Sequence, residues 1–183
     1  MEKYIIENCA PTLASLKTAN LFSYVCPSPE ALEVYIACWN QRMKGKGVSM
    51  CVLRIREHTA LIYVYRKEFL KRDMKRPGVT EFLRGLGYEH ADTDYAVSKL
   101  KERLNEGAGF PHEIGLFLGY PLGDVIGFVE NSGRNCICAG CWKVYCNVGE
   151  AVRTFQKFKK CTEVYVRLWS QGRRNVWQLT VAA

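Results

Sequence analysis

The chain has 183 residues, of which 48% are hydrophobic and 24% are charged. This composition is typical of a folded globular domain and excludes an intrinsically disordered or collagen-like chain. No apolar run approaches the roughly 20 residues needed to cross a bilayer. Residues 1–4 lack the basic-then-apolar layout of a secretory signal. We therefore expect a soluble, cytoplasmic protein with a single domain over residues 1–183.

Basic residues outnumber acidic ones, with 26 Lys and Arg against 18 Asp and Glu, so the net charge is +8. Half of this excess lies in residues 66–76. Such an excess is compatible with binding to nucleic acid, to an anionic membrane surface or to an acidic partner. It is equally compatible with a solvated surface that has no partner, so the distribution of charge must decide between these interpretations.

The first half of the chain predicts helices and one hairpin. Residues 1–25 suggest a short helix that breaks at Pro11 and a second helical turn. Ser28-Pro29 is a capping hydroxyl followed by a first-turn proline, and apolar residues then recur at helical spacing. Residues 48–56 and 60–66 are rich in Val, Ile, Leu and Tyr, which predicts a β-hairpin. The second of these strands is apolar almost throughout, so we expect it to be interior.

The second half of the chain predicts further short helices, a short strand and one long helix. The expected helices cover residues 66–76 and 79–86, a segment beginning at Asp92, and residues 111–119, 121–131 and 151–172. Residues 142–145 and 176–181 predict short strands. The expected fold class is α+β: a compact single domain with about six helices packed on a small, mainly antiparallel sheet containing the hairpin near 48–66.

Nine cysteines, four of them within residues 136–146, form the first candidate site. Their odd number and the absence of a secretion signal argue against a disulfide framework. Cys138 and Cys141 have the spacing of a metal knuckle, with Gly140 relaxing the turn so that both sulfurs face one ion about 2.3 Å away. Zinc or an iron–sulfur cluster needs further ligands from elsewhere in the fold. The candidate metal ligands are Cys136, Cys138, Cys141, Cys161 and Cys9, with Cys146 and His112 as alternatives.

Two other interpretations of these cysteines stay open. The cysteines act as redox-active or regulatory thiols, or they are ordinary reduced cysteines in a turn. A thioredoxin-like site is disfavoured, because the residues after Cys141 are strand-like whereas that chemistry uses a helix N-terminus.

His112 and Glu113 form the second candidate site, at the start of a helical segment. The pair suggests ligand or metal contact in a pocket. Position 116 is leucine, so the two-histidine helix of zinc proteases is excluded. The structural alternative is that Glu113 favours the helix N-terminus while His112 bonds a neighbouring loop.

The basic helix over 66–76 is the third candidate site. Its bases would neutralise phosphates while Tyr63, Tyr65 and Phe69 stack on nucleobases. An acidic protein partner, such as a flavodoxin-like electron carrier, or a membrane surface suits the same helix. The residues proposed for this contact are Lys67, Lys71, Arg72, Lys75 and Arg76.

Three segments carry a resemblance to a known family: CAPTLA at 9–14, HEIGLFLGYPL at 112–122 and CWKVY at 141–145. Together they resemble a family of bacterial proteins known as a domain of unknown function. The resemblance spans nearly the whole chain and implies a bacterial, cytoplasmic and reducing setting. It assigns no catalytic residue.

The sequence favours a small accessory or binding protein over an enzyme. It contains no phosphate-binding glycine loop and no nucleophile elbow. The leading hypothesis is a metal- or redox-linked binding protein that uses the cysteine cluster. The alternatives are a nucleic-acid-binding protein that uses the basic helix and an enzyme with a pocket around His112 and Glu113.

Overall fold

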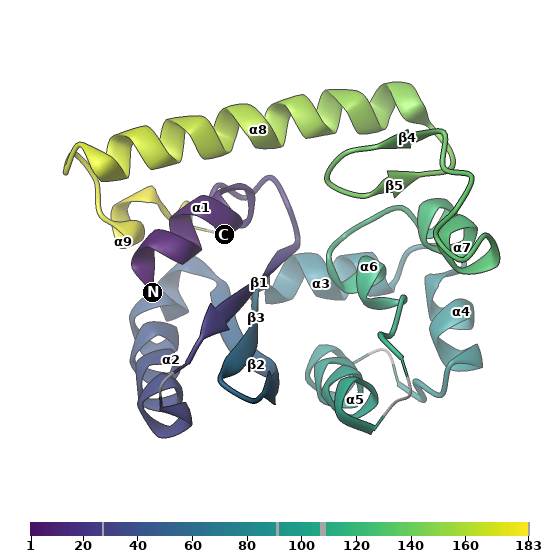
Figure 1. Cartoon of the computed structure of the whole chain (residues 1–183), viewed down its shortest axis with the longest axis horizontal. Helices are drawn as coiled ribbons and strands as arrows, with labels where there is room; N and C mark the ends of the chain where they lie inside the picture. The colour runs from purple at the N-terminus through teal and green to yellow at the C-terminus, as the bar shows by residue number, and fades with distance from the viewer. Residues whose placement is uncertain (27, 91, 107–108, 183) are drawn as a thin grey trace.

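The computed structural model describes residues 1–26, 28–90, 92–106 and 109–182 (Figure 1). Its helices are α1 (Glu2–Leu13), α2 (Pro29–Met43), the 3-10 turn η1 (Lys44–Lys46), α3 (Lys67–Met74), α4 (Val79–Gly85), α5 (Thr93–Glu106), α6 (Ile114–Phe117), α7 (Leu122–Glu130), α8 (Val148–Ser170) and α9 (Val176–Leu179). Its strands are β1 (Ala19–Val25), β2 (Val48–Arg56), β3 (Thr59–Arg66), β4 (Cys138–Ala139) and β5 (Lys143–Val144). The α+β class is confirmed, with nine α-helices in the described residues rather than about six.

A three-stranded antiparallel sheet has the strand order β1-β3-β2. Strands β2 and β3 form the expected hairpin, with Val48 opposite Arg66. Strand β3 is the central strand, as predicted, because β1 and β2 pair with its two edges. Its apolar sequence fits this position, since both of its faces are covered. Strands β4 and β5 pair separately as a small antiparallel hairpin.

The prediction for residues 1–25 was partly wrong. Helix α1 continues two residues beyond Pro11, since a proline in the last turn removes only one backbone donor. The expected second helical turn is strand β1, which pairs with β3 so that Ala19 lies opposite Tyr65. The pairing partner lies about 40 residues away in the chain, so a local pattern could not reveal this strand.

The prediction of a strand over residues 176–181 was also wrong. Residues 176–179 form helix α9, whose N-terminus is closed by a capping box between Asn175 and Gln178. Each side chain of this box bonds the backbone N–H of the other residue, which satisfies two donors at the helix end.

The central sheet is covered on both faces. Side chains on β3 alternate, so Ile62 and Val64 enter the core formed with α1, α2 and α9. Tyr63 and Tyr65 enter the other core, formed with α3 to α7. Figure 1 shows this division, with α1, α2 and α9 on one side of the sheet and α3 to α7 on the other.

Helix α8 runs along the molecule and connects its two halves (Figure 1). Its C-terminal part packs against the core around α1 and α2 through half-buried side chains such as Tyr165 and Trp169. Its N-terminal part lies near the β4–β5 hairpin. Only Ala151 and Phe158 of its 23 residues are fully buried. A groove lies beneath this helix, lined by several of its half-buried side chains.

Candidate functional site

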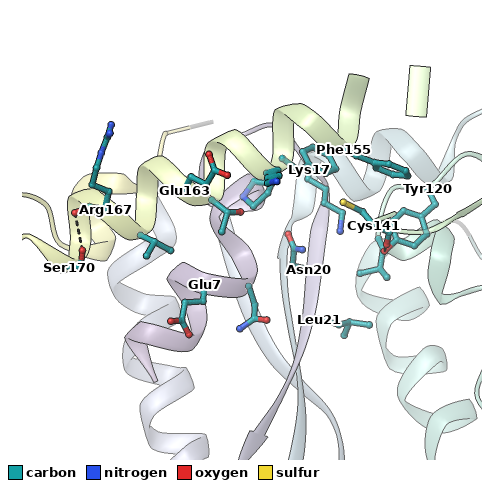
Figure 2. Close-up of a pocket in the computed structure, with 17 residues that line it drawn as sticks. Glu7, Lys17, Asn20, Leu21, Tyr120, Cys141, Phe155, Glu163, Arg167 and Ser170 are labelled. Atoms are coloured by element: carbon teal, nitrogen blue, oxygen red, sulfur yellow. Dashed lines mark hydrogen bonds between the residues drawn. The ribbon is translucent and has the colours of Figure 1, made fainter. Parts of the chain in front are cut away.

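The groove beneath α8 has a volume of about 970 Å³. It lies between α8, the end of α1, the start of β1 and the β4–β5 hairpin (Figure 2). One end holds Lys17, Tyr120, Cys141 and Phe155. The other end is polar and carries both signs of charge, with Glu163, Arg167 and Ser170 on α8 and Glu7 on α1. Apolar residues form much of the wall in between, namely Pro11, Leu21, Leu118, Phe158 and Val166.

Lys17 reaches the groove from the turn between α1 and β1. The backbone N–H groups of Leu16 and Lys17 both donate to the carbonyl of Pro11, at 2.9 and 3.2 Å. On the other side, the Thr18 hydroxyl donates to the buried carboxylate of Asp73. The Thr18 carbonyl accepts the N–H of Arg66 at 2.9 Å. The backbone of Lys17 is therefore fixed on both sides.

The Lys17 side chain is only 8% exposed. Its Nζ lies 5.1 Å from the ring centroid of Tyr120 and 5.9 Å from that of Phe158. Among the described residues, no carboxylate lies within ion-pair distance of this ammonium, although Glu7 and Glu163 line the same groove. Burial lowers the pKa of Lys17 to about 8, while the thiolate forms of Cys141 and Cys9 would raise it. The site thus contains a largely buried lysine whose ammonium lies near two aromatic rings and opens on the groove.

An aromatic wall holds Cys141 beside Lys17. The Tyr120 and Trp142 rings stack at 4.8 Å, and Trp142 meets Phe155 edge-on at 4.6 Å. The Tyr120 hydroxyl donates to the Cys141 carbonyl at 3.1 Å. Burial raises the pKa of Tyr120 to about 12, so this phenol stays neutral. Partial burial also raises the pKa of the Cys141 thiol, against the opposing effect of Lys17.

Asp124 on α7 holds the β4–β5 hairpin in place. This buried carboxylate accepts the Trp142 indole N–H at 2.7 Å, the Tyr145 N–H at 2.8 Å and the Cys146 N–H at 2.9 Å. It also accepts the Cys146 thiol at 3.2 Å. Four donors on one carboxylate satisfy its lone pairs and fix the loop. The cysteine-rich turn is therefore organised by a carboxylate.

The expected metal site is not assembled in the described part of the chain. There, no group of three or more His, Cys, Asp or Glu side chains is arranged to hold a metal ion. Gly140 also has a different role from the one expected, because a Cβ at this position would lie 2.3 Å from the Phe155 ring. The nine cysteines are all free thiols, with Cys9 buried, Cys136, Cys138 and Cys161 partly buried, and Cys141 and Cys146 exposed. Redox or regulatory chemistry of these thiols stays a prediction.

His112 and Glu113 have separate surroundings. Glu113 is buried and accepts hydrogen bonds from Arg103 at 2.5 Å and from Tyr88 at 3.1 Å, so its carboxylate is satisfied internally. His112 is exposed, and its ring lies 4.9 Å from that of Phe128. It lines two cavities of about 440 and 460 Å³. The two side chains therefore do not form a working pair, and enzymatic use of them stays a prediction.

The basic helix is largely as predicted, but much of its charge is paired. Arg66, which begins this stretch, is buried. Lys67 pairs with Asp94 at 2.5 Å, and Arg76 pairs with Asp73 at 2.7 Å. Arg72 approaches the same Asp73 carboxylate at 3.7 Å and lies over the Phe69 ring.

Two bases of this helix are exposed and form no ion pair within the described ranges, namely Lys71 and Lys75. The solvated face is therefore smaller than the sequence count suggests. Binding of nucleic acid or of an acidic partner by this face stays a prediction.

Sequence reasoning missed the centre of the groove. A single lysine in a turn carries no pattern, so Lys17 could not be singled out. Two features of the sequence did point to residues of this groove. Tyr120 lies in the 112–122 segment and Trp142 in the 141–145 segment, both of which carry the family resemblance. Phe155 and Phe158 also recur on one face of the long helix α8.

Comparison with known proteins places the chain in one family. The chain belongs to the family described as "Protein of unknown function (DUF3793)", whose family model matches residues 5–180. The resemblance seen in the sequence is therefore confirmed. Searches of curated proteins and of solved structures found no match to this chain. In the described residues, no helix combines the length and the apolar character required of a membrane span.

Proposed function

We propose that this protein binds a small organic anion with an apolar body in the groove beneath α8, and that Lys17 pairs with the anionic group. A single observation carries the proposal: the Lys17 side chain is buried, and its ammonium opens on the groove without an ion pair among the described residues. Burying an unpaired charge is costly, and a bound carboxylate or similar group would supply the missing partner.

The shape and lining of the groove support this choice of ligand. Its volume of about 970 Å³ is in the range of small-molecule sites. Leu21, Leu118 and Val166 offer apolar contact to the body of a ligand. Phe155 and Phe158 add aromatic surface near Lys17. An anion with an apolar body would therefore bury its hydrocarbon part along the groove while its charge meets the ammonium.

This function is a narrower form of the binding role expected from the sequence. Cys141 takes part as a neighbour of Lys17 rather than as a metal ligand. A metal-linked version has no donor set to support it within the described segments. Zinc and iron analysis of freshly purified protein tests the metal-linked hypothesis directly. About one equivalent of either metal per chain would support it.

Two fluorescent probes that share one aromatic body test the proposal. Anilinonaphthalene sulfonate carries an anionic group, whereas N-phenylnaphthylamine has no charge. We expect the sulfonate to bind wild-type protein and Lys17→Gln to weaken its binding about tenfold, or about 1.4 kcal/mol. Binding of the neutral probe should change by less than about twofold, because its apolar contacts remain.

Lys159 provides the matched control, because it also lines the groove but is exposed to solvent. Lys159→Gln should change sulfonate binding by no more than about twofold, since an exposed charge contributes little. Circular dichroism confirms that each variant is folded. The proposal fails if the sulfonate does not bind, or if Lys17→Gln weakens both probes equally.

A further inference from the structure

The environment of Lys17 also suits a covalent role. The amine lines an accessible groove of about 970 Å³, and among the described residues no carboxylate forms an ion pair with it. Its burial at 8% exposure disfavours the charged form, while the nearby Tyr120 and Phe158 rings offer the ammonium a weak compensating attraction. Burial lowers the pKa of Lys17 to about 8, so a neutral amine is far more abundant at pH 7 than on an exposed lysine. A neutral amine is the nucleophile in imine formation.

Cys141 adds a second functional group at the same end of the groove (Figure 2). Its backbone is held by the Tyr120 hydroxyl, and the Trp142 ring next to it is held by Asp124. Partial burial raises the pKa of the Cys141 thiol, so this group remains protonated at neutral pH. A protonated thiol beside the amine can give a proton to an oxygen atom that forms there.

We propose that Lys17 forms an imine with the keto group of α-keto acids that carry an apolar side chain. The inference rests on the proposed function, and it names the ligand class for the same groove. A keto acid carries one group for each protonation state of Lys17. Its carboxylate pairs with the ammonium on binding, and its neighbouring carbonyl carbon accepts the free amine. The apolar side chain then lies along the wall formed by Leu21, Leu118 and Val166.

The reaction balances without an oxidant or a reductant. The neutral amine attacks the carbonyl carbon, a C–N bond forms, and the carbonyl oxygen takes a proton from the Cys141 thiol. The nitrogen then loses a proton, which returns to the thiolate. The carbinolamine oxygen then takes up the proton that the ammonium had released to solvent when the free amine formed, which breaks the C–O bond and releases water as the nitrogen lone pair forms the C=N bond. Overall, an ammonium and a ketone give an iminium ion and one water, so the positive charge stays beside the ligand's carboxylate.

Reductive trapping with a matched pair of acids tests the inference. Phenylpyruvate carries the keto group, whereas phenylpropionate is the same acid without it. Each is incubated with the full-length protein and cyanoborohydride, and the adducts are mapped by peptide mass spectrometry. We expect phenylpyruvate to add its own mass less one oxygen atom, with about tenfold more adduct on Lys17 than on Lys159. Phenylpropionate should give no adduct.

Two variants and one competition measurement define the outcomes. Lys17→Arg keeps the charge but cannot form an imine, so the adduct should disappear, while Lys159→Arg should retain it. An adduct spread evenly over surface lysines, or retained in Lys17→Arg, would overturn the inference. If both acids displace anilinonaphthalene sulfonate but no adduct forms, the imine is wrong and the proposed function stands. If neither acid displaces the sulfonate and no adduct forms, both ideas fail for this ligand class.

Discussion

Two buried cations lie near the C-terminal end of α1, and they differ in their partners. Arg66 is 1% exposed and donates to the carbonyls of Thr12 at 2.6 Å, Leu13 at 2.7 Å and Val181 at 2.8 Å. It therefore supplies donors to the last carbonyl groups of α1 and holds the C-terminal segment against this helix end. Lys17 is almost as deeply buried, yet aromatic rings are its neighbours. A cation surrounded by carbonyls stabilises the fold, whereas a cation left beside a groove is available to a ligand.

The largest effect expected from this comparison comes from removing Arg66. Arg66→Met leaves several buried carbonyls without a donor, so we expect the free energy of unfolding to fall by about 3–5 kcal/mol. Urea denaturation followed by circular dichroism measures it. Lys17→Met is the matched control and should be at least as stable as wild type at pH 7, because it removes an unpaired buried charge. A stability loss below about 1 kcal/mol for Arg66→Met would contradict the claim that Arg66 stabilises the fold through its carbonyl partners.

An effect of intermediate size is expected of pH on the free energy of unfolding. Burial lowers the pKa of Lys17 from its usual 10.5 to about 8, so between these values the unfolded chain binds more protons than the folded one. Stability should therefore rise with pH across this window, by about 3 kcal/mol for this group alone. Below about pH 8 the cost of burying the charge is fully present.

The measurement is the difference in unfolding free energy between wild type and Lys17→Met at several pH values from 7 to about 10. The nearby thiols Cys9 and Cys141 are present in both proteins, so most of their titration cancels in the difference. Wild type should gain on the variant as pH rises. Parallel curves would show that Lys17 titrates as an ordinary exposed lysine.

The smallest effect concerns the wall of the groove. In Gly140→Ala the new methyl group would lie 2.3 Å from the Phe155 ring, which must move. We expect a stability loss of about 1–2 kcal/mol and weaker binding of anilinonaphthalene sulfonate, because the displaced ring enters the site. In the control Gly149→Ala, the methyl group meets only the Arg153 side chain, at 3.9 Å. Equal stability and equal probe binding in the two variants would argue against a packed wall at Gly140.

Much of the fold was predictable because its signals are local. Ser28 caps α2 through its side chain, with Pro29 in the first turn, as the sequence indicated. The hairpin of β2 and β3 formed as predicted from two runs rich in Val, Ile, Leu and Tyr. Strand β1 was not predictable, since its residues are strand only because β3 offers them an edge. Three of the five basic residues proposed for binding pair with carboxylates: Arg72 and Arg76 with the neighbouring Asp73, and Lys67 with Asp94, which lies 27 residues away.

The sequence by itself determined the family, the α+β class and most helix boundaries, because caps, turns and hydrophobic periods act over a few residues. Only the tertiary structure decided which charges are satisfied. Lys17 meets Tyr120 and Phe158, which lie more than a hundred residues further along the chain. Asp124, rather than a metal ion, gathers the donors of the cysteine-rich turn. Burial sets the free energy of a charge, and burial exists only once distant segments have packed together.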